Sequence, residues 1–457
     1  MSIVFAMILS IGIKGISAIV EIIIQMLITN GVGVSGYGEY TFYVSLIEGA
    51  YFMLFSGSVK LNTFYLSTPS ADIAAFKKKY TLCFVMPIVA VIIATFAIMR
   101  NPYGVVAGII LCIYYFAYDA SSVFFSRGKQ LPALLGEYLF GRLALLIGML
   151  AVMKWNTATG LVLLALYGLQ FVTMLLWFAP RMVKLQEGTN QVSVPLKKLA
   201  EYQVSDVANS LINYSPTILQ YVIGGAFTAG FTGIISLVKK FVSFISGPTA
   251  KVFLPEFSRL YKDGQREKLE QSYLMIVRIQ MVFIGTIGAA LIGFPYLCLK
   301  MFSPDLLQYA NVFTGVAVCL LLVAGIGPVT GMLQMTENEK ICNRNQWISI
   351  GAMILAWVIL WNEPLFAVYG LCVQIVVEGG LKYYSVCRWF GKNIVPIKNY
   401  VLLWLPVIVV RVMADWLGWQ YSFWAMILCV IFVLLWNIVF AMQDPMIKEA
   451  VWKKLKR

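Results

Sequence analysis

Residues 2–29 read SIVFAMILSIGIKGISAIVEIIIQMLIT, and GVGVSGYGEY follows at 31–40. The first stretch exceeds the roughly 20 apolar residues that a helix needs to cross the roughly 30 Å hydrocarbon core of a bilayer. The glycines at 31, 33 and 36 have dinucleotide-binding spacing, but that turn works only between a β-strand and a helix of a βαβ unit. Residues 40–57 are instead a second apolar stretch of membrane-spanning length. The glycines are therefore predicted to form a tight turn between two membrane helices.

The composition indicates a protein that lies mostly inside a membrane. Hydrophobic residues make up 60% of the 457 residues and charged residues only 12%, whereas a soluble globular chain carries about 25% charged residues. The absence of histidine excludes Ser-His-Asp triads, histidine metal sites and histidine proton relays. The eight cysteines form no Cys-x-x-Cys pair and lie mainly in apolar runs, so we expect no disulfide and no metal site.

The sequence also lacks the features of an ATP-driven or catalytic membrane protein. The phosphate-binding motif GxxxxGK(S/T) does not occur, and the longest hydrophilic stretch is residues 181–202. No loop is long enough to form an ATPase or an extracytoplasmic catalytic domain. We therefore expect no enzyme activity, no catalytic residue and no cofactor.

The apolar stretches predict an all-α polytopic membrane protein with about fourteen transmembrane helices. The predicted spans are residues 2–29, 38–60, 78–98, 104–126, 131–153, 158–180, 203–226, 229–258, 272–298, 308–335, 341–361, 365–390, 398–416 and 419–442.

Basic residues gather on one side of this topology. Cytoplasmic loops carry an excess of Lys and Arg, and the opposite loops hold only Arg100, Lys154 and Lys300. Both termini are therefore predicted to be cytoplasmic. The net charge of +14 follows mostly from this asymmetry, so it requires no nucleic-acid partner. The basic side holds Lys77, Lys78, Lys79, Arg127, Lys129, Arg181, Lys184, Lys197, Lys198, Arg259, Lys262, Arg266, Lys268, Lys340, Arg344, Arg388, Lys392 and Lys398, followed by the basic tail.

The chain shows a weak internal repeat. The glycine-containing segment 35–38 opens span 2, and a similar segment at 229–233 opens span 8, about 194 residues later. Six spans separate them, so the two halves have the same orientation, as in a parallel repeat about an axis along the membrane normal. The predicted domains are an N-terminal lobe of six spans (1–180), a cytoplasmic linker (181–202), a C-terminal lobe of six spans (203–392), and two additional spans with a basic tail (393–457).

Two spans carry a polar stripe at helical spacing. Such a stripe cannot face lipid, because each unsatisfied polar group there costs several kcal/mol. It forms either interhelical hydrogen bonds or the wall of a hydrated cavity, and its occurrence at equivalent places of a repeat favours the cavity. The stripes are Ser10, Lys14, Ser17, Glu21 and Gln25 in span 1, and Gln203, Asp206, Asn209, Ser210, Asn213, Thr217 and Gln220 in span 7.

Charged residues inside predicted spans are candidate functional residues, because a lysine at mid-bilayer costs about 3 kcal/mol. Glu378 and Lys382 are four residues apart and are expected to pair with each other. Lys60 and Lys251 could instead extend to the membrane interface. The candidate cations are Lys14, Lys60, Lys239, Lys240 and Lys251, and the candidate anions are Glu21, Glu48, Asp119, Glu137, Asp206 and Glu256.

Four stretches resemble the polysaccharide flippases (Wzx-type O-antigen and capsule repeat-unit flippases) of the multidrug/oligosaccharidyl-lipid/polysaccharide exporter superfamily. They are GYGEYTFYVSLIE (36–48), LPEFSRLYKDGQREKLEQSY (254–273), GVAVCLLLVAGIGPVTGMLQMTENEKICNRNQW (315–347) and VYGLCVQIVVEGGLKYYSVCRWFG (368–391). The resemblance extends over most of the chain and is more specific for the superfamily than for any one substrate.

The resemblance implies two six-helix lobes around a central cavity that opens alternately to each side of the bacterial cytoplasmic (inner) membrane. It implies a polyprenyl-pyrophosphate-linked oligosaccharide as the substrate, a membrane-lipid environment, and association with a polysaccharide polymerase. Basic residues on spans 1, 2 and 8 would hold the diphosphate; this chain has lysines there, where family members often have arginine. The expected substrate-binding residues are Lys14, Lys60, Lys239, Lys240, Lys251, Asn209, Asn213 and Gln25, and the acids expected to couple an H⁺ or Na⁺ gradient are Glu21, Glu48, Asp119 and Asp206.

Other functions stay open from the sequence alone. A peptidoglycan-precursor lipid flippase would have the same fourteen spans. A multidrug exporter of the same superfamily would prefer an acidic cavity, which the basic span 8 disfavours. A membrane glycosyltransferase or polymerase would be expected to carry a larger extracytoplasmic loop, and a scaffold would not need two polar stripes.

Overall fold

The computed structural model describes residues 3–57, 102–127, 129–155, 157–182, 196–394 and 397–442, together with the single positions 59, 62, 66, 72, 73 and 185. Throughout these ranges the regular structure is helical, without strands. The chain divides into two compact units, Met1–Gly233 and Ile234–Arg457. The predicted lobes have different boundaries and stay a prediction.

The first unit consists of long helices that correspond to the predicted spans 1, 2 and 4 to 7. Span 3 lies outside the described residues. The helices are α1 (Ile3–Leu54), α4 (Pro102–Ser126), α5 (Gln130–Leu134), the π-helix η1 (Leu135–Phe140), α6 (Gly141–Lys154), α7 (Gly160–Met182), α8 (Leu196–Gly224) and the beginning of α9 (Ala226–Lys262).

The predicted turn after the first span is a sharp break inside α1. Gly33 has φ 73° and ψ 173°, a conformation that is essentially restricted to glycine because it has no Cβ. Helical hydrogen bonding resumes directly after it, so α1 covers both predicted spans 1 and 2. At about 1.5 Å per residue, its 52 residues are far longer than one bilayer crossing needs.

Side-chain contacts fix the direction of the first half of α1. Lys14 meets Tyr138, and Glu21 meets Arg142 further along both helices. The order is the same in the two segments, so this half runs parallel to η1 and α6. Spans 1 and 5 of a polytopic chain are expected to run in the same direction.

The second half of α1 runs antiparallel to α8. The rings of Phe42 and Tyr221 are stacked with centroids 4.2 Å apart, whereas Ser56, further along α1, meets Asp206, earlier along α8. Spans 2 and 7 are expected to run in opposite directions, so these contacts agree with the predicted alternation.

The positive-φ glycines support the internal repeat. Gly33 breaks α1 at φ 73°, and Gly225, with φ 86°, separates α8 from α9. The two positions are 192 residues apart, close to the predicted spacing of about 194. Each break follows a helix with a polar stripe, so the same backbone device recurs at the same place of each half.

A pair of close backbone contacts repeats at the same spacing. A Cβ on Gly38 would overlap the carbonyl oxygen of Ala226, and a Cβ on Gly230 would overlap the carbonyl oxygen of Val34. Residues 38 and 230 are counterparts in a 192-residue repeat, and so are 34 and 226. The two contacts are therefore related by a local twofold axis, as expected for a parallel repeat.

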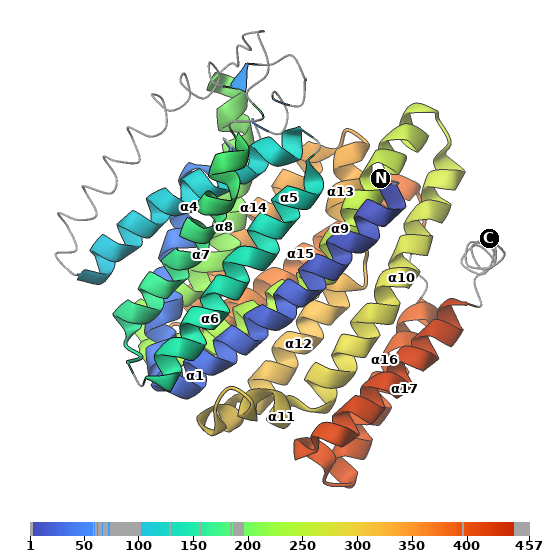
Figure 1. Cartoon of the computed structure of the whole chain (residues 1–457). Coiled ribbons are helices and arrows are strands. Elements are labelled where there is room, and N and C mark those ends of the chain that lie inside the picture. The colour runs from blue at the N-terminus through green and yellow to red at the C-terminus, as the bar shows by residue number, and fades with distance from the viewer. Residues whose placement is uncertain are drawn as a thin grey trace. The chain divides into compact units, whose positions relative to one another are not determined.

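The second unit contains the remaining helices, and α10 lies beside α16 and α17 in Figure 1. The rest of α9 is followed by α10 (Arg266–Gly293), α11 (Pro295–Lys300), the 3₁₀-helix η3 (Pro304–Tyr309), α12 (Ala310–Ala324), α13 (Val329–Met335), α14 (Glu339–Ile359), α15 (Phe366–Phe390), α16 (Ile397–Trp416), the 3₁₀-helix η4 (Trp419–Tyr421) and α17 (Phe423–Ala441).

The predicted span at 308–335 is interrupted. It separates into α12 and α13 at Gly327, which has φ 96°, and Pro328, which has no N–H group to donate. A carbonyl released at the break, that of Ile326, accepts a 2.6 Å hydrogen bond from the Tyr273 hydroxyl. The pattern is apolar on both sides of the break, and the Gly-Pro pair at 327–328 was its signal in the sequence.

Seven helices in the described part of the chain are long and apolar enough to cross a membrane. The first, Ile13–Leu54, has enough residues for two crossings. The others are Pro102–Ser126, Leu131–Lys154, Gly160–Met182, Arg266–Gly293, Pro304–Val323 and Phe423–Ala441.

Candidate functional site

An ion pair lies inside the first unit, between two membrane helices. The Arg142 guanidinium on α6 contacts the Glu21 carboxylate on α1, and their side chains are only 25% and 16% exposed. The Gln25 amide, one turn along α1, donates a 2.8 Å hydrogen bond to the other carboxylate oxygen of Glu21. Glu21 is therefore held from two sides, and the span 1 stripe faces α6.

Lys14 extends the basic character of this site. Its ammonium lies 5.0 Å from the centroid of the Tyr138 ring, within the range of a cation–π interaction. Lys14 and Glu21 are two turns apart on one face of α1, and Arg142 of α6 contacts the Glu21 carboxylate. We call Lys14, Glu21, Gln25, Tyr138 and Arg142 the basic cluster.

The π-helix η1 positions the residues of α5 and α6 that face α1. A π-turn inserts an extra residue into a helix and is frequent at functional sites. At Gly136 a Cβ would lie 2.5 Å from the Phe178 ring of α7, and at Gly141 it would lie 3.0 Å from the Gln170 carbonyl oxygen. These glycines let the segment approach α7 closely, and Arg142 projects toward α1.

A second group of polar residues surrounds Glu48, which is 8% exposed. The Tyr167 hydroxyl donates a 2.8 Å hydrogen bond to it. Tyr114 and Tyr118 stack on each other nearby, with centroids 4.7 Å apart, and both contact Phe171. An acid inside a wall of tyrosines has hydroxyl partners for both its protonated and its ionised form.

Asp119 and Glu137 have hydroxyl or amide partners as well. The Asn62 amide donates a 2.7 Å hydrogen bond to Asp119, and the Ser121 hydroxyl donates a 2.9 Å bond to Glu137. These acids lie on the helices that pack around α1, so the membrane part of the first unit contains several carboxylates with polar partners.

The polar stripe of α8 divides into two sets. Part of it bonds to α1: the Ser56 hydroxyl donates a 2.6 Å bond to Asp206, and Gln203 donates to the backbone carbonyls of Phe52 and Met53 at 2.6 and 2.7 Å. Those residues form interhelical hydrogen bonds, the plainer of the two predicted roles. Asn213, by contrast, has an exposed side chain.

The 192-residue repeat aligns the two stripes residue by residue. Glu21 corresponds to Asn213, so the acid of one half is an amide in the other. The remaining counterparts are Lys14 and Asp206, Ser17 and Asn209, and Gln25 and Thr217.

The predicted basic residues of span 8 lie in the second unit. Lys239 is half-buried, and its charge interacts with Glu378 on α15. Glu378 also forms the predicted ion pair with Lys382, at 2.7 Å, and accepts a 2.6 Å hydrogen bond from Gln374. Lys240 is exposed. Outside the described part of the protein lie Lys60 and the side chains of Lys251 and Glu256.

Arg142 is the functional candidate that the sequence reasoning missed. It follows Glu137 by five residues inside the predicted span 131–153, where the run EYLFGR interrupts apolar residues. Two opposite charges within one span were a sufficient signal. Glu137 was among the candidate anions, but Arg142, five residues later in the same span, was not among the candidate cations.

The helices have a fold similar to that of solved transporter structures, among them members of the MOP superfamily. No protein-family model matches the sequence, and no curated protein sequence matches it. The solved structure of the lipid II flippase MurJ in an inward closed conformation is similar over 96% of this chain and 99% of that chain, with 14% identity and a TM-score of 0.67.

Multidrug transporters share the fold less completely. An inward-facing MATE family transporter of the MOP superfamily is 15% identical over 82% of this chain and 98% of that chain, with a TM-score of 0.60. The MATE multidrug transporter DinF-BH is 13% identical over 84% and 93%, with a TM-score of 0.57. At these identities the likeness shows the fold, and it confirms the prediction of an all-α polytopic membrane protein. The neighbours are transporters and flippases, not enzymes.

Proposed function

We propose that this protein is a flippase that moves a polyprenyl-pyrophosphate-linked oligosaccharide repeat unit from the cytoplasmic to the outer leaflet by alternating access. The observation that carries the proposal is the basic cluster, in which Arg142 and Lys14 lie within membrane helices of a MOP-type fold. Charged residues inside a membrane mark the path of a substrate or an ion. Within the cluster, two cations accompany one carboxylate, a balance that suits an anionic substrate such as a diphosphate.

The ion pair between Arg142 and Glu21 supplies a means of exchange. A guanidinium binds a carboxylate or a phosphate through the same planar pair of donors. The diphosphate can therefore replace Glu21 at Arg142, and the released carboxylate can take up a proton. Protonation of Glu21 from one side would free Arg142 for substrate, which couples substrate binding to an H⁺ gradient.

The other predicted residues extend this scheme. Lys14, Lys60, Lys239, Lys240 and Lys251 would attract the diphosphate from spans 1, 2 and 8. One ammonium about 4 Å from a phosphate oxygen contributes about 4 kcal/mol at an effective dielectric of about 20. Sugar hydroxyls would bond to amides, for which Gln25, Asn209 and Asn213 are the candidates, and Glu48, Asp119 and Asp206 remain candidates for ion coupling together with Glu21.

Alternating access would involve the contact between α1 and α8. In the predicted lobe division, α1 belongs to the N-terminal lobe and α8 to the C-terminal lobe. The bonds from Ser56 and Gln203 would then join the lobes at the cytoplasmic end, and their release would open the path to that side. The sugar would cross in a hydrated cavity because each dry hydroxyl costs several kcal/mol, while the prenyl tail stays in lipid.

The proposal includes the setting of the reaction. The protein would lie in the bacterial cytoplasmic membrane with both termini in the cytoplasm. It would work beside a polymerase in the biosynthesis of lipopolysaccharide O-antigen or capsule. The basic side of the topology and the resemblance of the quoted stretches support this setting.

A peptidoglycan-precursor flippase is the second candidate. It is favoured by the similarity to the lipid II flippase, which covers nearly the whole of both chains, whereas the MATE structures cover 82% and 84% of this chain. Multidrug export is the third candidate. The two cations of the basic cluster oppose a cationic substrate, whereas the carboxylates of Glu48, Asp119 and Glu137 in the same unit would suit one.

Depletion of the protein tests the proposal directly. Polyprenyl-linked glycans would be extracted and measured by mass spectrometry, with an impermeant probe to read the leaflet. We expect a polyprenyl-pyrophosphate oligosaccharide to accumulate on the cytoplasmic face. Arg142→Gln should restore flipping at least about tenfold less well than wild type, because a charged hydrogen-bonding group is lost. Lys154→Gln is the matched control, since Lys154 is exposed at the end of the same helix.

The outcomes separate the candidates. Accumulation of a peptidoglycan precursor would identify the second candidate. An unchanged lipid profile would exclude both flippases and leave solute export. Rescue by Arg142→Gln equal to that by wild type would remove the basic cluster from the mechanism.

A further inference from the structure

A pocket of about 440 Å³ lies in the second unit, where the α9–α10 turn meets the end of α15, and no residue of the basic cluster lines it. Its floor is formed by Leu260 and Leu269, which are 4% and 0% exposed and belong to the core of this unit. Gly264, with φ 67°, makes the tight turn between the two helices. The pocket therefore combines buried core residues with a tight turn, and it is open on one side.

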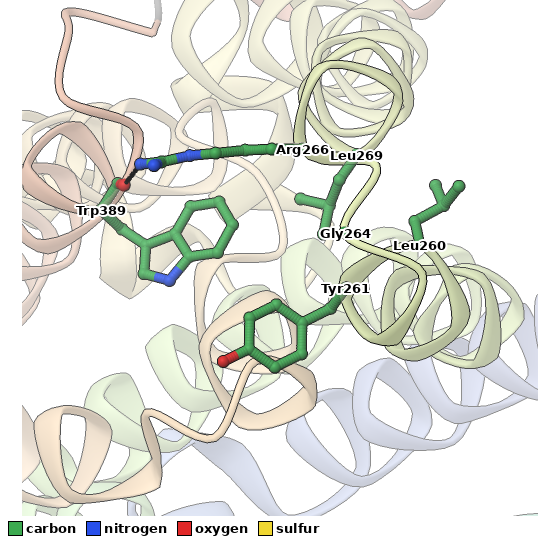
Figure 2. A pocket seen from close by; sticks show the side chains of 6 residues that line it. All are labelled: Leu260, Tyr261, Gly264, Arg266, Leu269 and Trp389. Carbon is green, nitrogen blue, oxygen red and sulfur yellow. Dashed lines mark hydrogen bonds between the residues drawn. The ribbon is translucent and has the colours of Figure 1, made fainter.

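A cation and two aromatic rings form the rim (Figure 2). The Arg266 guanidinium lies 5.1 Å from the centroid of the Trp389 ring and donates a hydrogen bond to the Trp389 backbone carbonyl. The rings of Tyr261 and Trp389 lie with centroids 6.5 Å apart. This carbonyl bond at the end of α15 engages one of the five N–H donors of the guanidinium, and the exposed Arg266 side chain has further donors for a ligand.

The surroundings of the pocket are basic. The exposed residues Arg259, Lys268 and Arg388 are each adjacent in sequence to a residue that lines it. Of the nearby acids, Glu270 is engaged by Lys392 at 2.8 Å, and Asp263 and Glu267 are exposed to solvent. Along 257–270 and 387–394 the sequence has six basic and three acidic residues, so the local charge is positive.

The predicted topology places the pocket at the cytoplasmic membrane interface. It is located where α9 and α15 end and α10 begins, next to loops of the predicted cytoplasmic side. Tyr and Trp concentrate at the headgroup level of a bilayer, and the cytoplasmic leaflet is the one that carries anionic phospholipids. Basic pockets between membrane helices on that side suit the headgroups of such lipids.

We propose that this pocket binds the headgroup of an anionic phospholipid of the cytoplasmic leaflet. Arg266 donates to the phosphate, Trp389 and Tyr261 contact the glycerol region, and the acyl chains remain in the bilayer beside α10 and α15. A planar guanidinium already stacked on a ring is held in place before the lipid arrives, which reduces the ordering that binding requires. This site is independent of the substrate that the protein transports.

Native mass spectrometry of the purified full-length protein tests the site. The protein is mixed with equal amounts of phosphatidylglycerol and phosphatidylcholine, and the lipids retained are counted. We expect wild type to retain phosphatidylglycerol preferentially and Arg266→Gln to retain about tenfold less of it, as expected for the loss of a charged donor. Arg266→Lys, which keeps the charge but loses the planar fork, should fall between the two.

Lys300→Gln is the matched control. Like Arg266, Lys300 has its charged group near an aromatic ring, 5.4 Å from the Tyr421 ring centroid. It lies on α11, which follows the opposite end of α10 from the pocket. It should retain phosphatidylglycerol as wild type does. Equal retention of the two lipids by wild type, or undiminished retention by both Arg266 variants, would overturn the proposal. Displacement of the lipid by an equal concentration of glycerol phosphate would also overturn it, since the site would then bind a soluble phosphate.

Discussion

The two ends of the contact that the second half of α1 makes with α8 and α9 are held by different forces. At one end, Gly38 and Gly230 let backbone approach backbone, against Ala226 and Val34, with no room for a side chain. At the other end, side chains make the contact. There the Ser56 hydroxyl donates to Asp206, and Gln203 bonds to the α1 backbone.

This difference predicts different behaviour. A hydrogen bond that opens can be replaced by a bond to water, so its net contribution is only about 1 kcal/mol. A close backbone contact has no such replacement and depends on shape alone. We therefore expect the glycine end to be sensitive to volume and the hydrogen-bonded end to be sensitive to chemistry, and to open more easily.

The largest expected effect is that of Gly38→Ala. The added methyl group would overlap the Ala226 carbonyl, so α9 must move away, at a cost of about 1–3 kcal/mol or more. Gly230→Ala should act in the same direction, because it is the repeat counterpart. Thermal melting of the purified protein measures both.

Gly15→Ala is the control for these variants. It lies in the same helix as Gly38, and a Cβ added there would meet no atom within 4 Å, while alanine favours a helix over glycine by about 1 kcal/mol. Its melting temperature should equal or exceed that of wild type. If Gly38→Ala melts as Gly15→Ala does, the close contact is not important for stability.

A disulfide across the hydrogen-bonded end should abolish transport. Ser56→Cys and Asp206→Cys would be combined in a chain whose own eight cysteines are replaced by serine or alanine. If this end must open in each cycle, the oxidised protein should lose flipping and a thiol reductant should restore it. Each single-cysteine variant serves as the control. Full activity of the oxidised, cross-linked protein would show that this end stays closed during transport.

The sequence anticipated the parts of this molecule that depend on periodicity. The stripe residues Glu21 and Gln25 do share one helix face, and they contact each other. The pairing of Glu378 with Lys382 follows from a four-residue spacing that α15 preserves. The repeat was also visible, although its spacing is 192 by the backbone breaks and not about 194.

Features that arise from departures from regular helix could not be read in this way. The π-helix η1, which directly precedes the α6 segment that carries Arg142, is one such departure, and no single residue indicates a π-turn. The sequence predicts a tight turn at the glycines, whereas the structure has a one-residue break at Gly33. A glycine-rich segment is compatible with a turn and with a break, so the sequence could not distinguish them. A stripe residue bonds to a neighbouring helix only where that helix offers a partner. Asp206 accepts a hydrogen bond from Ser56 of α1, and the pattern within α8 could not predict this partner.

Removal of a single bond at the hydrogen-bonded end should have a moderate effect. Ser56→Ala leaves Asp206, which is 5% exposed, without this donor, and should lower stability by about 1–2 kcal/mol. The loss should be smaller than for Gly38→Ala. A larger loss would reverse the order that the two kinds of contact predict.

The smallest expected effect lies between the two ends, where Phe42 and Tyr221 stack at 4.2 Å with an interplanar angle of 17°. Tyr221→Leu keeps an apolar side chain and removes the stack, which is worth about 0.5–1.5 kcal/mol beyond buried area. A double-mutant cycle with Phe42→Leu isolates this interaction from the change in volume. A coupling energy within that range would show that the Phe42–Tyr221 stack stabilises the contact between α1 and α8. This contribution would add to the close backbone packing at the glycine end and to the hydrogen bonds at the other end. Additive single effects would mean that this stack contributes nothing, and that the contact depends on the two ends and on the Ser210 hydrogen bond to Gly49.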